Sequence, residues 1–223
     1  MTSIFRQALG ADFDRLHPAL QRRFDVGLDT GYACVGTGRM SEIRRGPWWT
    51  VPFLQVGKIR NILVADVGKD VPFRIENYPY RDPFGRETVT FVREFSVRKK
   101  PSRFDATMIL SNGRVVDYLG THQHLAVDLD LTVEPDGSLL LRSGAQRFYE
   151  GRLIGFRFPM IFSGRAELRE SFDDVASEYR IDLEVRNRFF GFLFGYSGTF
   201  TCAFPDATDA PARLKPARHQ RRV

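Results

Sequence analysis

The sequence has few of the residues that motifs for catalysis and metal binding require. Only two cysteines and four histidines occur among 223 residues. Cys34 and Cys202 stand far apart and in no Cys-x-x-Cys spacing, which excludes the common zinc and dithiol redox motifs. We expect two buried free thiols in a reducing cytoplasm, with a disulfide between the first and last strands as the alternative.

Long apolar runs are also missing. No run is long enough to span a bilayer, and the N-terminal stretch has no apolar core of signal-peptide length. We therefore expect a cytoplasmic protein without membrane contact. The sequence also lacks Gly-x-Ser-x-Gly, His-Glu-x-x-His and a phosphate-cradling glycine loop ahead of a helix. No residue cluster identifies a reaction, and we expect no cofactor and no metal ion.

The net charge of +6 does not indicate a nucleic-acid-binding face. About half of it lies after Phe204, where five basic residues meet two aspartates. Elsewhere, lysines and arginines are spread among acidic residues rather than gathered with aromatics on one face, so we expect no nucleic-acid partner. Residues 205–223 are rich in proline, alanine and basic residues. We predict a disordered basic tail behind a single domain of residues 1–204.

Phenylalanine, by contrast, is abundant, with 20 residues. The richest stretch, from Phe189 to Phe204, mixes aromatics with glycines on a strand-like segment. Glycine inside a strand marks a bend, a bulge or a close backbone approach, so the stretch predicts a curled sheet around an apolar interior. Alternation puts five aromatic rings on a single face: Phe192, Phe194, Tyr196, Phe200 and Phe204.

Most of the chain beyond residue 70 alternates between apolar and polar residues. Residues 127–133 and 179–185 follow a period of two, which predicts strands with one buried and one solvated face. Turn signals at residues 82–85 and 111–113 join such runs as hairpins. We predict an α+β fold, predominantly antiparallel β, with about nine strands in a curled sheet, β-barrel or half-barrel.

Helical spacing occurs in two places. Between Ser3 and Val26 the apolar residues recur at helical intervals that are interrupted at Gly10 and Pro18, which predicts two short N-terminal helices. The same spacing predicts one inserted amphipathic helix that carries Phe53, Val56, Ile59, Ile62 and Leu63.

Trp48 and Trp49 precede the predicted inserted helix and are flanked by Pro47 and Pro52. A tryptophan pair at this position either anchors the helix on the sheet or forms a lid or lipid-contacting knuckle at the mouth of the barrel. We favour the anchoring role.

Arg93 interrupts an apolar strand face, because alternation places it beside Phe91 and Phe95. A buried guanidinium needs a partner, since an unpaired buried charge costs roughly several kcal/mol. Two interpretations stay open: Arg93 holds the anionic head group of a ligand in a cavity, or it pairs with a carboxylate on a neighbouring strand.

Four further residues are weak candidates for acid–base chemistry: His122, His124, Asp117 and Glu94. Two histidines in a His-x-His pattern point to one side of a strand, as metal ligands do, and Asp117, Asp128 or Asp130 could supply a third ligand. A metal site also needs an open, preorganised geometry that the sequence does not show, so we favour a surface or rim histidine pair. An aspartate next to a tyrosine, as at Asp117, has little specificity for catalysis.

Four segments of the chain, in order and spacing, resemble those of a known bacterial family. They are Leu9–Leu20, Phe91–Phe95, Leu153–Pro159 and Gly191–Gly198. The family is a domain of unknown function that occurs alone or fused C-terminal to saccharopine-dehydrogenase-like Rossmann domains. The resemblance implies a single curled β-domain that in some cases acts beside a dehydrogenase-like protein, and it supplies no catalytic residues. At the position of Phe91 the family commonly has tryptophan.

We predict that the barrel binds a small apolar or amphipathic ligand, for example an anionic lipid-like one, with Arg93 at its polar end. One alternative is a cavity enzyme of the isomerase, cyclase or hydrolase type that uses the four acid–base candidates. The other is an interaction module for a saccharopine-dehydrogenase-like partner. The apolar wall of the site would consist of Phe91, Phe95, Phe192, Phe194, Tyr196 and Phe200.

Overall fold

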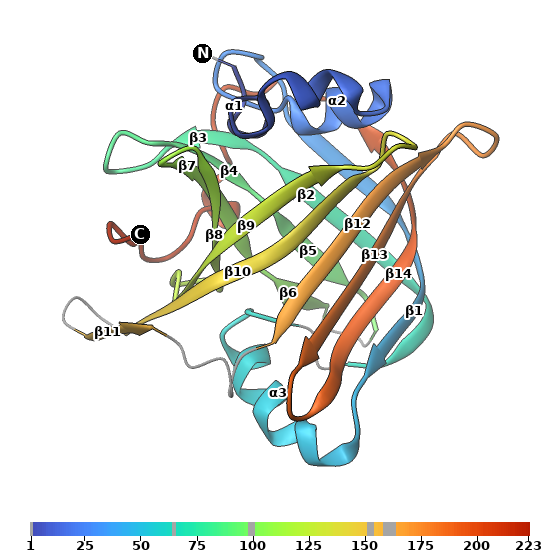
Figure 1. Cartoon of the computed structure of the whole chain (residues 1–223), viewed down its shortest axis with the longest axis vertical. Helices are drawn as coiled ribbons and strands as arrows, with labels where there is room; N and C mark the ends of the chain where they lie inside the picture. Colours follow the sequence, from blue (N-terminus) through green and yellow to red (C-terminus); the bar gives the residue numbers. More distant parts are fainter. Residues whose placement is uncertain (1, 64–65, 98–100, 151–153, 158–163) are drawn as a thin grey trace.

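A curled antiparallel sheet makes up most of the structure, a computed structural model that describes residues 2–63, 66–97, 101–150, 154–157 and 164–223 (Figure 1). As predicted, apolar and polar residues alternate along its strands, with the apolar side chains on the buried face. In β13 (Glu178–Asn187), Tyr179, Ile181 and Leu183 are buried while their polar neighbours face solvent. The fold is therefore mostly antiparallel β, with a half-barrel shape.

Fourteen strands are hydrogen-bonded in the described part of the chain, so the expected count of nine was too low. Thirteen follow one continuous path, and β11 pairs with β10 beside that path. The remaining strands are β1 (Cys34–Arg45), β2 (Gly68–Asn77), β3 (Pro79–Arg81), β4 (Glu87–Thr90), β5 (Val92–Phe95), β6 (Ser102–Phe104), β7 (Ala106–Ser111), β8 (Arg114–Leu119), β9 (Leu125–Val133), β10 (Leu139–Glu150), β11 (Ile154–Arg157), β12 (Arg165–Asp173) and β14 (Gly191–Ala203).

Bends explain much of the difference in strand count. The chain passes from β2 to β3 at Tyr78, from β4 to β5 at Phe91 and from β6 to β7 at Asp105. The strands β2, β5 and β6 form one end of the sheet path, while β3, β4 and β7 form the other, so the chain itself joins the two ends. Backbone hydrogen bonds continue through the bends, for example from Phe91 N to Ala106 O at 2.7 Å. A period of two persists through such a bend, so alternation alone predicts one long strand.

Short helices lie at the two ends of the half-barrel (Figure 1). The two predicted N-terminal helices are present as α1 (Ile4–Leu9) and α2 (Pro18–Phe24), with a 3-10 turn at Gly10–Arg15 between them. Gly10, with φ of 57°, ends α1 in the left-handed region. No helix in the described part of the chain has the length and apolar character that crossing a bilayer requires.

At the opposite end, a 3-10 turn at Trp48–Thr50 leads into α3 (Val51–Ile59). The helical prediction extended too far, because Ile62 and Leu63 lie beyond the helix. Asn61 explains the early end: its φ of 54° is left-handed, and asparagine tolerates this conformation at helix C-termini.

Aromatic rings fill one part of the interior, and two of them, Phe200 and Tyr179, lie next to Arg23 of α2. Phe95 lies between Phe73 and Tyr196, with ring centroids 5.2 and 5.0 Å apart. Phe200 packs against Phe73 at 5.8 Å and stacks on Tyr179 at 5.3 Å. We call these five residues the ring-packed end, and it is a solid core rather than the wall of a hollow.

A buried ion pair belongs to the same end of the interior. The guanidinium of Arg23, from α2, donates to both carboxylate oxygens of Glu170 and, at 2.9 Å, to the amide oxygen of Asn77. Its Nη1 also lies 3.4 Å from the sulfur of Cys34. Both cysteines are free thiols, Cys34 buried and Cys202 half-buried.

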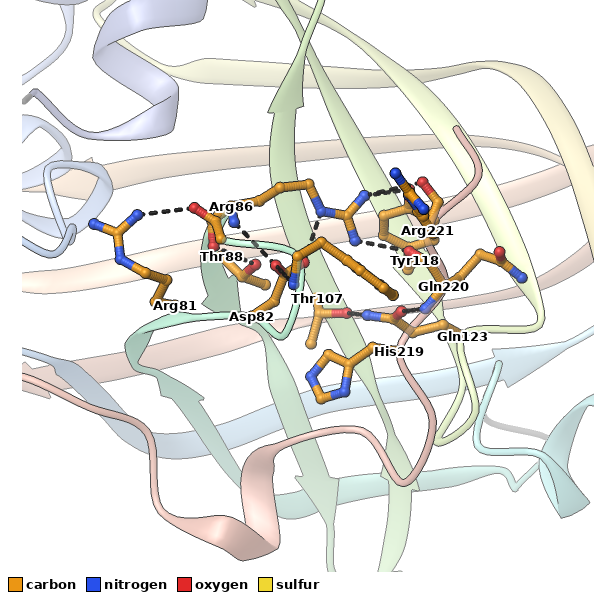
Figure 2. A network of polar contacts seen from close by, with 12 residues as sticks. Arg81, Asp82, Arg86, Thr88, Thr107, Tyr118, Gln123, His219, Gln220 and Arg221 are labelled. Carbon is orange, nitrogen blue, oxygen red and sulfur yellow. Dashed lines mark hydrogen bonds and ion pairs between the residues drawn. The ribbon is translucent and has the colours of Figure 1, made fainter. Parts of the chain in front are cut away.

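The sequence predicted disorder for residues 205–223. In the structure these residues run along the outer face of the sheet (Figure 2). Arg86 donates to the carbonyl oxygen of Gln220 at 2.7 Å. The side chain of Gln123 bridges sheet and tail, because it donates to the Thr107 hydroxyl at 2.7 Å and accepts from the backbone N–H of Gln220. The tail therefore has specific buried contacts with the sheet.

An ion pair holds the tail nearer to its start. Arg213 donates to both carboxylate oxygens of the buried Glu76, at 2.6 and 2.8 Å. These hydrogen bonds, with help from Arg74, lower the pKa of Glu76 to about 2. The division between a domain of residues 1–204 and a tail stays a prediction.

Candidate functional site

A cavity of about 150 Å³ lies inside the half-barrel at the α3 end. The residues that follow α3 and the strand ends next to the β13–β14 turn line the cavity at this end. Except at four positions the lining side chains are apolar: Ile62, Leu63, Phe104, Met108, Leu119, Leu125, Val127, Leu129, Leu141, Ala166, Leu168, Leu183, Val185, Leu193 and Phe194. Such a lining is typical of small-molecule pockets, in which a few polar groups set the orientation of the ligand.

The four polar side chains of the lining are Arg93, Asp117, Ser143 and Gln146. Two of them already hydrogen-bond to the backbone of the segment that includes β12. The Ser143 hydroxyl accepts from the N–H of Ala166 at 2.8 Å, and the Gln146 amide donates to the carbonyl of Gly164 at 2.7 Å. The charged pair, Arg93 and Asp117, is different.

Arg93 sits in the middle of β5, and only 4% of its surface is exposed. Its backbone lies in register with Ile75 on one side and Phe104 on the other, so it has no carboxylate directly across either strand. The guanidinium carbon lies 4.9 Å from the ring centroid of Phe104, and Nε has no hydrogen-bond partner among the described residues. Of the two roles that the sequence left open for Arg93, the pairing with a carboxylate is not seen in the described residues.

Asp117 lies in β8 between Met108 of β7 and Val127 of β9, both of which line the cavity. Its Oδ1 atom is buried and has no hydrogen-bond partner among the described residues. Burial raises the pKa of Asp117 to about 7, and the nearby positive charge of Arg93 opposes that rise. At neutral pH this carboxyl group is therefore partly protonated.

A third buried polar atom lies near Arg93. The hydroxyl of Tyr196 is buried beside the Arg93 guanidinium, and no contact of this oxygen meets the distance and angle of a full hydrogen bond among the described residues. Burial raises the pKa of Tyr196, and the charge of Arg93 opposes this rise too. The positive charge of Arg93 therefore acts on both Asp117 and Tyr196. Each of these three side chains has an unsatisfied buried polar atom, and buried polar atoms are normally hydrogen-bonded.

The structure distributes the predicted aromatic wall over three places. Phe194 lines the cavity. Phe95, Tyr196 and Phe200 belong to the ring-packed end, and Phe91 packs against Phe5 of α1 with ring centroids 5.8 Å apart.

Phe192 is partly exposed, below Arg44 and Arg186. The register between β13 and β14 shifts next to it, where Val185 pairs with Phe194 but Arg186 pairs with Phe192. This bulge breaks the alternation, so the rings of Phe192 and Phe194 do not share a face.

The other acid–base candidates lie away from the cavity. His124 is buried against Phe148, and His122 is exposed 5.4 Å from it, ring centroid to centroid. Glu94 lies on the outer face in register with Arg74 and Arg103. Within the described residues, no group of three His, Cys, Asp or Glu side chains could hold a metal ion.

Sequence reasoning did not find most of the cavity lining. Leu125, Val127 and Leu129 could have been assigned from the alternation of β9. In β8 both faces are buried, so the sequence pattern does not predict that the side chain of Asp117 points into the barrel. Of the segments that suggested the family resemblance, Leu153, Phe158 and Pro159 lie outside the described residues.

Comparison with known proteins places most of the chain in one family. Residues 16–200 match the model "Domain of unknown function (DUF4166)". The uncharacterized protein YndH of Bacillus subtilis (strain 168) is 32% identical over 204 residues, which cover 90% of this chain and 97% of that protein. The chain therefore belongs to the DUF4166 family, in agreement with the resemblance to a bacterial domain of unknown function.

Proposed function

We propose that the protein binds a small amphipathic carboxylic acid in the interior cavity, with the carboxylate between Arg93 and Asp117. One observation carries the proposal: a guanidinium and a carboxyl group, each with an unsatisfied buried atom, face the same apolar cavity. A carboxylate would accept hydrogen bonds from the guanidinium and from protonated Asp117. It would thereby satisfy both groups that the described residues leave without partners.

The size of the cavity limits the ligand. A dry apolar cavity of about 150 Å³ in another protein holds benzene. A cavity of about 150 Å³ here suits a single ring or a short alkyl chain rather than a full-length fatty acid. Benzoate and short-chain carboxylates are therefore the first probes, and toluene is the neutral counterpart of benzoate.

Isothermal titration with benzoate and toluene tests the proposal. The Arg93→Met variant should lose at least about tenfold in benzoate affinity, because a charge-assisted hydrogen bond contributes roughly 1.5–3 kcal/mol. Its affinity for toluene should persist, since the apolar lining is retained. Arg114→Met, at an exposed position in β8, is the matched control and should bind both probes normally. Equal benzoate affinity of the Arg93→Met variant and the wild type would reject the proposal.

The affinity for benzoate should also depend on pH. A bound carboxylate stabilises the proton on Asp117, so binding raises the pKa of this residue above its free value of about 7. As the pH rises above 7, binding must then take up a proton, and the affinity should fall by up to about tenfold per pH unit. The Asp117→Asn variant, which is neutral throughout, should show no such slope.

We propose proton transfer as a second candidate function, because a cavity carboxyl group with a pKa of about 7 is suited to act as a general acid or base near neutral pH. The reaction would be an isomerisation in which Asp117 removes a proton from a bound substrate and returns it. Exchange of the α-protons of cyclohexanone in D₂O, followed by NMR, tests this. Loss of enzyme-dependent exchange in Asp117→Asn would support it, and equal exchange by the variant and the wild type would reject it.

A further inference from the structure

Exposed aromatic side chains gather at the α3 end of the molecule. Trp48 and Trp49, on the turn before α3, are 79% and 56% exposed, and Phe189 and Phe190, on the β13–β14 turn, are 64% and 49% exposed. We call these four residues the aromatic patch. Together with Val67 they make up five of the eight large hydrophobic side chains that are exposed in the described part of the chain.

The two turns that carry the aromatic patch lie side by side. Gly46, just before the first turn, donates its N–H to the carbonyl of Leu193 at 2.7 Å. A Cβ atom on Gly46 would come within 2.2 Å of the carbonyl oxygen of Phe192, which shows how closely the two segments approach. Both turns project from the same end of the half-barrel (Figure 1). Trp48 and Trp49 therefore do not bury their rings as anchors of α3, the role that the sequence favoured.

Exposed arginines flank the aromatic patch along the chain and on the neighbouring strand β12. Arg45, Arg165 and Arg188 are exposed and make no ion pair within the described residues. Arg186, whose side chain is 62% exposed, pairs with Glu184 at 2.9 Å. In addition, Arg165 and Arg186 are directly opposite each other across β12 and β13. Like charges at opposed positions destabilise a sheet, and Glu184 pairs with only one of these two arginines, so an anion at this surface would offset the remaining repulsion.

We propose that the aromatic patch and its arginines bind the surface of an anionic lipid membrane. Tryptophan and phenylalanine insert at the level of the lipid headgroups, and arginines beside them attract anionic lipids. The patch consists of two projecting turns rather than a groove, a shape that suits a flat surface better than a peptide. This binding is independent of the cavity, and variants of Arg93 or Asp117 should retain it.

The tryptophans supply a direct assay, because Trp48 and Trp49 are the only two in the chain. Any blue shift of tryptophan emission on addition of vesicles therefore reports on this surface alone. We expect a blue shift and co-sedimentation with vesicles of phosphatidylcholine and phosphatidylglycerol in a 7:3 ratio. Both signals should weaken when NaCl is raised, because the exposed charges are then screened.

Two double variants and two controls test which residues are responsible. Phe189→Ser with Phe190→Ser, and Arg45→Ser with Arg188→Ser, should each lower the vesicle partition coefficient at least about tenfold, since a surface arginine contributes about 1 kcal/mol. Phe84→Ser and Arg114→Ser change an exposed aromatic and an exposed arginine elsewhere, and neither should have an effect. Circular dichroism establishes that each variant is folded.

Three results would overturn the proposal. The first is the absence of a blue shift and of co-sedimentation with anionic vesicles while the protein is folded. The second is binding to pure phosphatidylcholine vesicles that equals binding to the anionic vesicles and is unchanged in the double arginine variant. The third is a protein partner that needs the same residues although vesicles do not bind, which would assign the patch to a protein interface.

Discussion

The two ends of the half-barrel interior each bury an arginine, but in different surroundings. At the ring-packed end, Arg23 donates to both oxygens of Glu170 and to Asn77, so its charge is paired and its donors are used. At the cavity end, Arg93 and Asp117 each have a polar atom without a partner among the described residues. The first arrangement completes a core, whereas the second leaves hydrogen-bonding capacity that a bound molecule could use.

The contrast predicts a large difference in stability between two similar substitutions. Arg23→Met should lower the free energy of unfolding by about 3–5 kcal/mol, because Glu170 is then left buried and unpaired. Arg93→Met should change it by less than about 1 kcal/mol, since methionine replaces a charge that has no ion-pair partner. Urea unfolding at pH 7 measures both values. Similar losses in the two variants would show that Arg93 is as fully paired as Arg23.

Asp117 should give the protein a distinctive dependence of stability on pH. The pKa of Asp117 in the folded protein, about 7, is above its value in the unfolded chain. The contribution of Asp117 to the free energy of unfolding is therefore complete below about pH 4, where the carboxyl group is protonated in both states, and it is lost as the pH rises through 7. Relative to Asp117→Asn, the unfolding free energy of the wild type should fall by about 1.4 kcal/mol per pH unit between these limits. Parallel curves for the two proteins would place the pKa of Asp117 near its ordinary value.

Adding methyl groups at the ring-packed end and at the cavity should have a smaller effect on stability. In Gly36→Ala the new Cβ would lie 2.6 Å from Ile75 and 2.7 Å from Phe200, and the crowding should cost about 1–3 kcal/mol. Ala166→Val adds its methyl groups next to the cavity and should change stability by less than about 1 kcal/mol while weakening benzoate binding. Thermal unfolding separates the two cases, and equal destabilisation would indicate that the cavity end is as tightly packed as the other.

Sequence patterns predicted the strands and the N-terminal helices well, because alternation and helical spacing are local properties. They did not predict the bends at Tyr78, Phe91 and Asp105, since a bend leaves the period of two intact. They also placed Phe192 and Phe194 on one face, which a single bulge prevents.

For the candidate site, the sequence identified Arg93 as the residue to explain but gave Asp117 little weight. A lone aspartate in a strand that is buried on both faces carries no local sign of its direction. Pairing between strands that are distant in sequence decides which carboxylate faces the same cavity as Arg93. That information is present only in the folded structure.

The pairing of β1 with β14 has a consequence for synthesis of the chain. Val35 lies opposite Ala203, so one edge of β1 has no partner until synthesis of the chain has passed β14, more than 150 residues later. Such non-local pairing slows folding and leaves a strand edge open to other chains in the meantime. Nascent protein truncated before β14 should therefore be prone to aggregation.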